Sequence, residues 1–376
     1  MIYFDNAATT YPKPNEVYEA LDYANRNAFN SGRGSYKSSK KCSNIIDETR
    51  KLVLNIGKIN DGKVIFTESA TTALNRIIFG IDLKKGDNIY ISPFEHNSIV
   101  RPLNELKEQL GINIIVLPFI KDDEWIADEE KIGNMFAINK PKAIMLSHVS
   151  NTTGFILPYE MIFKLGKRFN SINVLDSAQA FGIVDINNIK DIDYIVFAGH
   201  KSLYSSFGIA GIVKLGKDML KKTIFGGTGS DTMNPKMSND IPDGYEAGSH
   251  NIVAIQGLNA GLKWLSEHNV FEHEKKMTEY LITQLKMNDK VKIYLPNNTK
   301  KILGIVSISI NGYDSNDVGA ILDDEFDICV RTGYHCAPLV HEFIDSIDSN
   351  GTVRISLGYF NTKEEIDTLI EALKSL

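Results

Sequence analysis

The sequence predicts an α/β fold in which a large domain with a mainly parallel β-sheet precedes a smaller α+β C-terminal domain. One observation is the composition, because 43% hydrophobic and 23% charged residues in a chain of 376 allow a full core. The other is an alternation of short apolar runs with longer segments of helical period. This alternation is typical of parallel strands joined by helices, whose ligands bind beyond the carboxyl ends of the strands.

The predicted elements of the large domain follow one another regularly. Segments of helical period at 70–80 and 98–110 separate the first three strand-like runs. The strands are expected near 63–66, 88–92, 113–117, 143–147, 174–176, 194–197 and 210–214.

The pattern changes in the last third of the chain. A long helical period covers 252–287, and helices are expected near Asp317 and Lys363. Strands are expected at 291–294, 305–310 and 352–356. We therefore predict three parts. Residues 1–14 form an N-terminal segment that packs on the small domain, and residues 15–255 form the large domain. Residues 256–376 form a long linking helix and the small domain.

Charge and cysteine content exclude several classes of protein. The 41 basic and 47 acidic residues give a net charge of −6 without a dense basic block, so nucleic acid is not expected as a partner. The N-terminus lacks a signal-peptide pattern, and the apolar stretch 112–120 is interrupted by Asn113 and Pro118, so a cytoplasmic protein without membrane contact is expected. Three cysteines are too few for a disulfide framework.

Two residues after strand-like runs indicate a cofactor. Asp176 ends one apolar run, and Lys201 follows a second run 25 residues later. An amine and a carboxylate at neighbouring strand ends can hold pyridoxal phosphate, because the amine forms the Schiff base and the carboxylate keeps the ring nitrogen protonated. Taken alone, Lys201 is equally a solvated surface lysine, and Asp176 an N-cap.

The phosphate of such a cofactor has candidate partners before a predicted helix. Ala70, Thr71 and Thr72 begin this helix, whose first backbone N–H groups favour an anion. His200 is a candidate for the same phosphate, and Gln179 can donate a hydrogen bond to a ring hydroxyl. Helix capping explains the hydroxyl residues as well.

Histidines after two other strands could face the same crevice. His96 follows one strand, where an imidazole could stack on the cofactor ring and move protons. His148 and Asn151 follow another and could contact cofactor or substrate. A lone histidine is about as often structural.

With these motifs the chain resembles the fold-type I pyridoxal phosphate enzymes of the class V aminotransferase family, in the cysteine desulfurase and selenocysteine lyase branch. The similar segments run nearly end to end: 5–10, 95–96, 148–151, 176–179, 199–201, 246–248, 331–338 and 354–356. The resemblance implies a large domain with a mainly parallel, seven-stranded type of sheet and a smaller C-terminal domain.

The resemblance also implies roles for individual residues. It makes Lys201 the Schiff-base lysine, Asp176 the pyridinium partner, Gln179 the ring-hydroxyl contact and His96 the stacking residue. It assigns the substrate carboxylate to Arg354, for which a guanidinium is well suited, with further substrate contacts from Asn151, Arg331 and Ala8. Ser249 matches a residue that the partner subunit offers to the phosphate, which implies a homodimer.

Cys336 lies in the motif that the resemblance assigns to sulfur transfer. There it attacks the sulfur of bound cysteine and becomes a persulfide, leaving alanine, and His335 and Arg331 are expected to favour its thiolate. A buried structural thiol is the alternative, which suits Cys42 and Cys329 better. No metal is predicted, because a site from Cys336, His335 and His341 lacks a second cysteine at ligand spacing.

The sequence therefore predicts a homodimeric cysteine desulfurase that converts L-cysteine to L-alanine, with a sulfur-acceptor protein as a further partner. Four departures from the family pattern keep alternatives open: Ala198 replaces a hydroxyl residue, 205–208 replace a Gly-Pro pair, Tyr36 stands where relatives often have histidine, and the segment after Cys336 is one residue shorter. The alternatives are a selenocysteine or cystine lyase, a class V aminotransferase or epimerase, and a scaffold of low activity in sulfur delivery.

Overall fold

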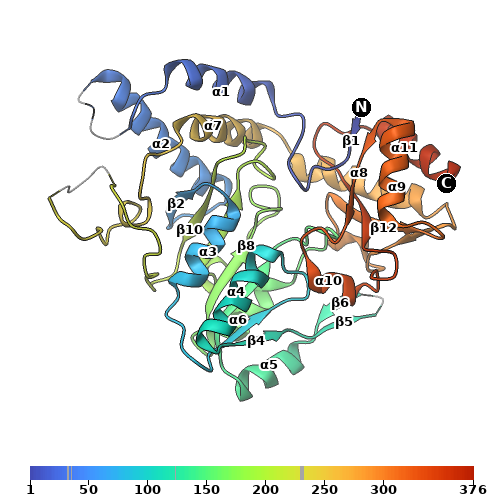
Figure 1. The fold of residues 1–376 in the computed structure, drawn as a ribbon, viewed down its shortest axis with the longest axis horizontal. Coiled ribbons are helices and arrows are strands. Elements are labelled where there is room, and N and C mark those ends of the chain that lie inside the picture. The colour runs from blue at the N-terminus through green and yellow to red at the C-terminus, as the bar shows by residue number, and fades with distance from the viewer. Residues whose placement is uncertain (32–33, 35, 123, 229–232) are drawn as a thin grey trace.

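The computed structural model describes residues 1–31, 34, 36–122, 124–228 and 233–376. The large domain occupies most of the left and centre of Figure 1, and the small domain, which includes the C-terminus, lies to the right beside the N-terminus. This arrangement matters because the candidate active site lies where the two domains meet.

A seven-stranded sheet forms the centre of the large domain. Its strand order is β2-β10-β9-β8-β7-β3-β4, and all strands run parallel except β10, which is antiparallel to both of its neighbours. The strands are β2 (Lys63–Thr67), β3 (Asn88–Ile91), β4 (Asn113–Val116), β7 (Pro141–Ser147), β8 (Ile172–Asp176), β9 (Tyr194–Ala198) and β10 (Ala210–Lys214). The predicted, mainly parallel sheet is confirmed.

Helices cover both faces of this sheet. Successive side chains of a strand point to opposite faces, so Ile195 joins one apolar cluster and Val196 the other. One face packs against α3 (Ala70–Gly80) and α4 (Asn97–Leu110). The other face packs against α2 (Lys37–Ile56), α5 (Glu129–Ile138), α6 (Tyr159–Lys167) and α7 (Ile252–Glu267), and α1 (Asn15–Asn27) lies on α7.

The small domain has an antiparallel four-stranded sheet with helices against it. Its strand order is β11-β12-β15-β14, from β11 (Val291–Ile293), β12 (Ile305–Ile310), β15 (Thr352–Ser356) and β14 (Arg331–Gly333). Its helices are α8 (Val270–Leu285), α9 (Ser315–Phe326), α10 (Pro338–Phe343) and α11 (Lys363–Ser375).

The long helical pattern at 252–287 forms two helices instead of one. The helix α7 ends at Glu267, and the side chain of Asn269 accepts a hydrogen bond from the backbone N–H of Glu272 to begin α8. An asparagine N-cap stabilises the start of a new helix. The apolar period of the sequence therefore continues from α7 into α8, although the chain forms two separate helices.

The first residues of the chain lie beside the small domain. The strand β1 (Ile2–Tyr3) pairs in parallel with β13 (Ile328–Cys329), and the chain then crosses toward the large domain. A short antiparallel hairpin, β5 (Phe119–Lys121) and β6 (Trp125–Ala127), completes the strands of the described residues. Within those residues we find no helix with the length and apolar character needed to cross a bilayer.

Candidate active site

Lys201 lies just beyond the carboxyl end of β9, where the chain turns back into β10. Gly199 makes this turn possible, because a Cβ atom there would lie 2.7 Å from the backbone oxygen of Ile209. The Lys201 side chain lines a cavity, and no hydrogen bond or ion pair within the described ranges engages its amine. Burial lowers the pKa of Lys201 to about 8, against the opposing effect of Asp176.

Asp176 ends the neighbouring strand β8 and lines the same cavity. Its Oδ1 atom accepts a hydrogen bond of 3.0 Å from the backbone N–H of Ala178, so it also has the local turn role considered from the sequence. Burial raises the pKa of Asp176, and the N–H of Ala178 and the Lys201 amine oppose this rise. Gln179 lines the cavity too and donates to the backbone oxygen of Ala7 at 2.9 Å.

The first turn of α3 borders the cavity through Ala70 and Thr71. Ser69 caps this helix, because its Oγ atom accepts from the backbone N–H of Thr72 at 3.1 Å. The Thr72 hydroxyl lies 3.0 Å from the same Oγ atom, and Thr72 is not among the cavity-lining residues. Within the described part of the chain, the backbone N–H groups of Ala70 and Thr71 make no hydrogen bond, so they remain available to an anion.

His200, which follows β9 just before Lys201, and His96, which follows β3, also border the cavity. Burial lowers the pKa of His200 to about 3, and its Nδ1 atom is buried without a hydrogen-bond partner in the described residues. His96 caps α4, and its Nδ1 atom accepts from the backbone N–H of Ser98 at 3.1 Å. Burial and nearby cations lower the pKa of His96 to about 4. Both rings are therefore neutral at pH 7.

His148 does not line this cavity. It is fully buried, its Nδ1 atom lies 3.0 Å from the hydroxyl of Ser177, and its ring packs edge-on against Tyr159. Of the histidines that follow strands, His148 therefore has the structural role.

The lining residues fit the pyridoxal phosphate predicted from the sequence. An unpaired amine, a buried carboxylate and an amide line one cavity, as the aldehyde, ring nitrogen and ring hydroxyl of this cofactor require. The unpaired Nδ1 atom of His200 and the free N–H groups of α3 are polar groups without a protein partner, which an anionic phosphate could satisfy. Ala198 also lines the cavity and offers the phosphate no hydroxyl.

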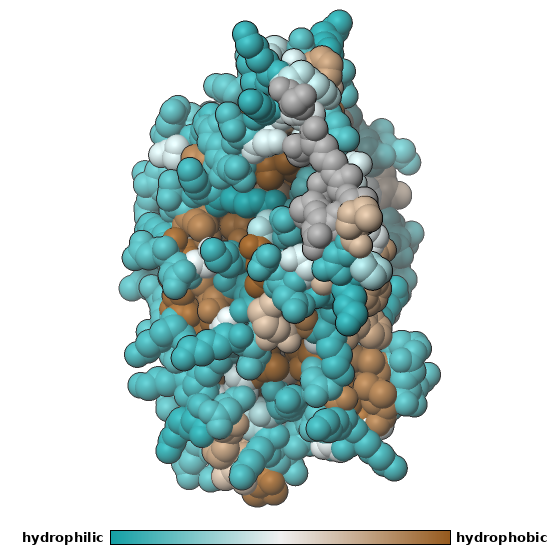
Figure 2. Space-filling view, turned by 90° about the vertical axis from the view of Figure 1, so that its left-hand side faces the viewer, coloured by the Kyte–Doolittle hydropathy of each residue, from teal (hydrophilic) through white to brown (hydrophobic). Residues whose placement is uncertain are grey.

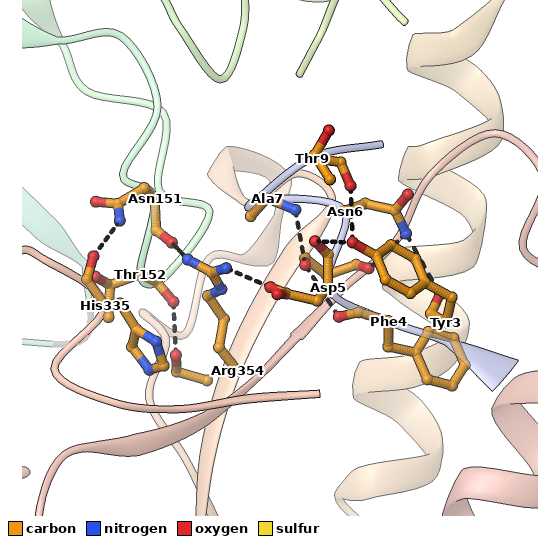
Figure 3. A network of polar contacts seen from close by, with 12 residues as sticks. Tyr3, Phe4, Asp5, Asn6, Ala7, Thr9, Asn151, Thr152, His335 and Arg354 are labelled. Atoms are coloured by element: carbon orange, nitrogen blue, oxygen red, sulfur yellow. Dashed lines mark hydrogen bonds and ion pairs between the residues drawn. The ribbon is translucent and has the colours of Figure 1, made fainter. Parts of the chain in front are cut away.

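Arg354 stands at the centre of a polar network that joins three distant parts of the chain (Figure 3). Only 2% of its surface is exposed. One terminal nitrogen pairs with Oδ1 of Asp5 at 2.6 Å, and the other donates to the backbone oxygen of Asn151 at 2.9 Å. The Asn151 side chain in turn donates to the backbone oxygen of His335 at 2.7 Å. The Nε atom of Arg354 has no partner in the described residues.

Cys336 follows β14 in a loop with unusual backbone geometry. Gly333, His335 and Cys336 have positive φ angles of 89°, 47° and 57°. The backbone oxygen of Cys336 accepts from the N–H of Asn97, at the start of α4, at 2.7 Å. The thiol is exposed and borders a second cavity, of about 410 Å³, that also includes His96. The loop thus brings a thiol of the small domain to a cavity next to that of Lys201.

The expectation that His335 favours ionisation of this thiol is wrong. Only 4% of His335 is exposed, and its Nε2 atom lies 2.8 Å from Oγ1 of Thr352, so the ring anchors the loop to β15. Burial holds the pKa of His335 well below its usual range, and a neutral ring supplies no positive charge. Arg331, which is exposed and opposite Arg354 in the sheet, remains a cation of this region.

The other predicted site residues lie at the edges of these networks. Ala8 is half-buried in the N-terminal turn, where its N–H donates to the oxygen of Asp5 at 3.0 Å. Ser249 is exposed and lines a different cavity, together with Arg50 and Glu246, away from Lys201. Within one chain, Ser249 is therefore not part of the Lys201 site.

Two residues of the site were missed in the sequence. Lys13 donates from Nζ to Oγ1 of Thr10 at 2.6 Å and to the backbone oxygen of His200 at 2.8 Å, next to Lys201. Burial lowers the pKa of Lys13 to about 7. Asp5 was noted only as part of a motif, although it pairs with Arg354. No local signal indicates either role, because His200 and Arg354 are far away in the chain.

Comparisons with known proteins agree with the family resemblance and with the fold. Residues 2–369 match the family model for class-V aminotransferases. The chain is 34% identical to a probable cysteine desulfurase of Pyrococcus abyssi, over the whole chain and 94% of the relative. It is 29% identical to a cysteine desulfurase of Escherichia coli, over the whole chain and 93% of the relative. The apo structure of a cysteine desulfurase from Thermococcus onnurineus superposes with a TM-score of 0.88 at 30% identity, covering all of this chain and 95% of the other.

Proposed function

The chain belongs to the class-V aminotransferase family, whose cofactor is pyridoxal phosphate, and from that premise we propose that it is a cysteine desulfurase. The reaction converts L-cysteine to L-alanine and leaves the sulfur as a persulfide on Cys336. One observation carries the proposal: the exposed thiol of Cys336 borders a cavity that shares His96, Thr71 and Ser98 with the cavity of Lys201.

The Lys201 side of the site holds the cofactor and moves protons. Bound pyridoxal phosphate would supply an electron sink at the α-carbon of the substrate. Lys201 has the amine that anchors it, and a pKa of about 8 lets this amine both accept and return a proton near neutral pH. Asp176 would pair with the ring nitrogen. His96 borders the same cavity and would face the ring, while its Nδ1 atom accepts from the backbone N–H of Ser98.

The substrate carboxylate is assigned to Arg354 and Asn151. Arg354 is held by Asp5 and by the backbone of Asn151, and its Nε atom still lacks a partner. A buried, unsatisfied guanidinium nitrogen is a strong donor for an incoming carboxylate. The amide of Asn151 lines the Lys201 cavity and thus links carboxylate binding to the cofactor.

Cys336 takes the sulfur. Its thiolate attacks the substrate sulfur, a new S–S bond forms, and the bond between that sulfur and the β-carbon breaks with its electron pair on carbon. Addition of a proton at the β-carbon completes the alanine side chain. The exposed position of the thiol allows it to carry the sulfur out of the site.

The proposed assembly is a homodimer. The side of the molecule shown in Figure 2 has apolar patches between polar ones. Segments on this side carry exposed large apolar side chains: Phe29, Tyr36, Ile224, Phe225 and Met233. Burial of such side chains drives association, and a partner could bring its Ser249 to the phosphate. Light scattering should give twice the 42.0 kDa of one chain, and a monomer would contradict the assembly.

The test of the activity combines a spectrum with product analysis. The protein with pyridoxal phosphate should absorb in the visible range, the absorbance should change on addition of L-cysteine, and alanine and protein-bound persulfide should form in equal amounts. We expect Cys336→Ala to lose alanine formation and keep the absorbance, while Cys329→Ala serves as the matched control. Turnover of cysteine to alanine by Cys336→Ala would show that Cys336 is not the nucleophile. Faster turnover of selenocysteine or cystine than of cysteine would identify a lyase instead.

A further inference from the structure

The cavity that contains the Cys336 thiol continues away from the cofactor as a groove. The helices α3 and α4 lie side by side, and both begin at the site (Figure 1). The groove is lined by Thr71, Asn75 and Phe79, which lie four residues apart on one face of α3. On its other side lie residues of α4 out to Glu105. Along α3, from Thr71 to Phe79, it therefore extends about 12 Å, or roughly two helical turns.

Arg101 on α4 is the cation of this groove. It is exposed, it lines the groove with Cys336, and no carboxylate among the described residues pairs with it. Glu105 lies one turn further along α4, where it accepts a hydrogen bond of 2.6 Å from Gln109. A free guanidinium near a reactive thiol is a binding group for an anion such as a carboxylate.

Positive charge gathers at the end of the groove that is near the thiol. Besides burial, four cations lower the pKa of His96, which lines the groove beside Cys336: Lys201, Arg331, Arg354 and Arg101. Glu105, at the distal end, is the acidic residue among those that line the groove. An anionic ligand would therefore be drawn toward the thiol end.

We propose that this groove binds the acceptor of the sulfur, and that the acceptor is a small thiol carrying a carboxylate, which Arg101 holds. The volume of about 410 Å³ falls within the roughly 300–1,000 Å³ typical of small-molecule sites. The inference rests on the proposed desulfurase activity, since that activity places the transferable sulfur on Cys336.

The transfer step needs no other reactant. The thiolate of the acceptor attacks the outer sulfur of the Cys336 persulfide, and an S–S bond forms between the acceptor sulfur and this outer sulfur. The bond between that sulfur and Sγ of Cys336 breaks, and Cys336 leaves as a thiolate. The acceptor departs as a persulfide, and the cysteine is ready for the next turnover.

The first experiment measures transfer to a charged and a neutral probe. The holoenzyme is loaded with sulfur by one turnover of L-cysteine and desalted, and persulfide is then transferred to 3-mercaptopropionate or to 2-mercaptoethanol. The ratio of the two rate constants is compared among the wild type, Arg101→Gln and the control Lys107→Gln, an exposed cation of α4 outside the groove lining. Each ratio contains the same two thiols, so their intrinsic reactivities cancel when the ratios of the three proteins are compared.

We expect the preference for 3-mercaptopropionate to fall roughly two- to fivefold in Arg101→Gln, as removal of one exposed charge predicts, and to stay unchanged in Lys107→Gln. Alanine formation in the single turnover should stay unchanged in both variants. Equal ratios in the wild type and Arg101→Gln would overturn the proposal, as would a parallel loss of alanine formation in Arg101→Gln, which would make the groove a substrate entrance.

A second experiment does not depend on desulfurase activity. Iodoacetate and iodoacetamide alkylate the same thiol, and the first carries a carboxylate. Mass spectrometry of the Cys336 peptide should show a ratio of iodoacetate to iodoacetamide modification that falls in Arg101→Gln and stays constant in Lys107→Gln. If no alanine forms but this ratio falls in Arg101→Gln, the proposed desulfurase activity is wrong, whereas the groove still binds carboxylates. If alanine forms and the ratio does not change, the groove proposal alone is wrong.

Discussion

Lys201 and Cys336 border the same site, but the fold holds them in different ways. Lys201 follows a fully buried strand inside a seven-stranded sheet, and its side chain points into a cavity. Cys336 lies in a loop of three positive-φ residues with an exposed thiol. The loop is fixed to the large domain through backbone oxygens, which accept from Asn97 and Asn151.

This difference matches the two tasks that we propose. An anchored cofactor has to stay in one position, which dense packing around β9 provides. A thiol that receives sulfur from a substrate and passes it to an acceptor has to meet both. Bonds to the backbone on either side of the Cys336 peptide fix the position of the loop and leave the side chain free. The predictions below test this contrast, beginning with the largest effect.

Loss of the cofactor amine should abolish both functions of the site. We expect Lys201→Ala to lower alanine formation by about 1,000-fold or more, because it removes the cofactor anchor and the proton-transfer group together. The visible absorbance should be lost as well, in contrast to Cys336→Ala. Lys201→Arg keeps the charge but cannot form the covalent bond, so activity in Lys201→Arg would contradict the assignment.

Asp5 should affect substrate binding more than cofactor binding. Asp5→Asn removes the charged partner of the buried Arg354, and hydrogen bonds to charged groups contribute about 1.5–3 kcal/mol. We expect the KM for cysteine to rise roughly 10- to 100-fold, with the visible absorbance unchanged. The control is Asp327→Asn, whose carboxylate pairs with the N-terminal amine at the surface. A lower KM in Asp5→Asn would show that Asp5 competes with the substrate for Arg354.

Asn151 should affect the loop of Cys336, in addition to its place in the lining of the Lys201 cavity. Asn151→Ala removes the hydrogen bond to the oxygen of His335, a neutral bond that contributes about 0.5–1.5 kcal/mol. Alkylation of Cys336 by iodoacetamide should become roughly 2- to 10-fold faster. Asn104→Ala, in which an exposed bond within α4 is lost, is the control. An unchanged alkylation rate would mean that the bond from Asn97 and the contact of His335 with Thr352 are enough to hold the loop.

Glu274, on α8 of the small domain, contacts the segment that follows Lys201 and should give the smallest effect. Its Oε1 atom accepts from the hydroxyl of Tyr204, in the segment after Lys201, at 3.1 Å, and burial raises its pKa from 4.5 to about 8. Between these values the folded protein keeps a proton that the unfolded chain releases, so stability falls as pH rises from about 4.5 to 8.

Glu274→Gln should remove this pH dependence. We expect a higher Tm than the wild type at pH 8 and a nearly equal Tm at pH 5, with about 2–4 °C for each kcal/mol of unfolding free energy regained. Thermal unfolding followed by circular dichroism at both pH values measures it. A Tm difference of the same size at both pH values would show that Glu274 is charged in the folded protein.

Local patterns in the sequence were sufficient for much of the fold. The helix predicted at 70–80 and the strands at 210–214, 305–310 and 352–356 occur with those bounds, because amphipathic and apolar periods depend on neighbouring residues. The helices α1 and α2 were not anticipated, and their apolar residues become meaningful only against α7. Asp176 and Lys201 could be placed together because parallel strands bring their carboxyl ends to one edge of the sheet.

The sequence by itself determined the sheet, the strand-end residues and the family to which the chain belongs. The tertiary structure decided that Asp5 pairs with Arg354, that Lys13 contacts His200, and that His335 is neutral and turned toward β15. The reason is physical. A strand end is set by residues a few positions away, whereas an ion pair between residues 349 positions apart, or the pKa of a buried imidazole, depends on which surfaces the folded chain brings together.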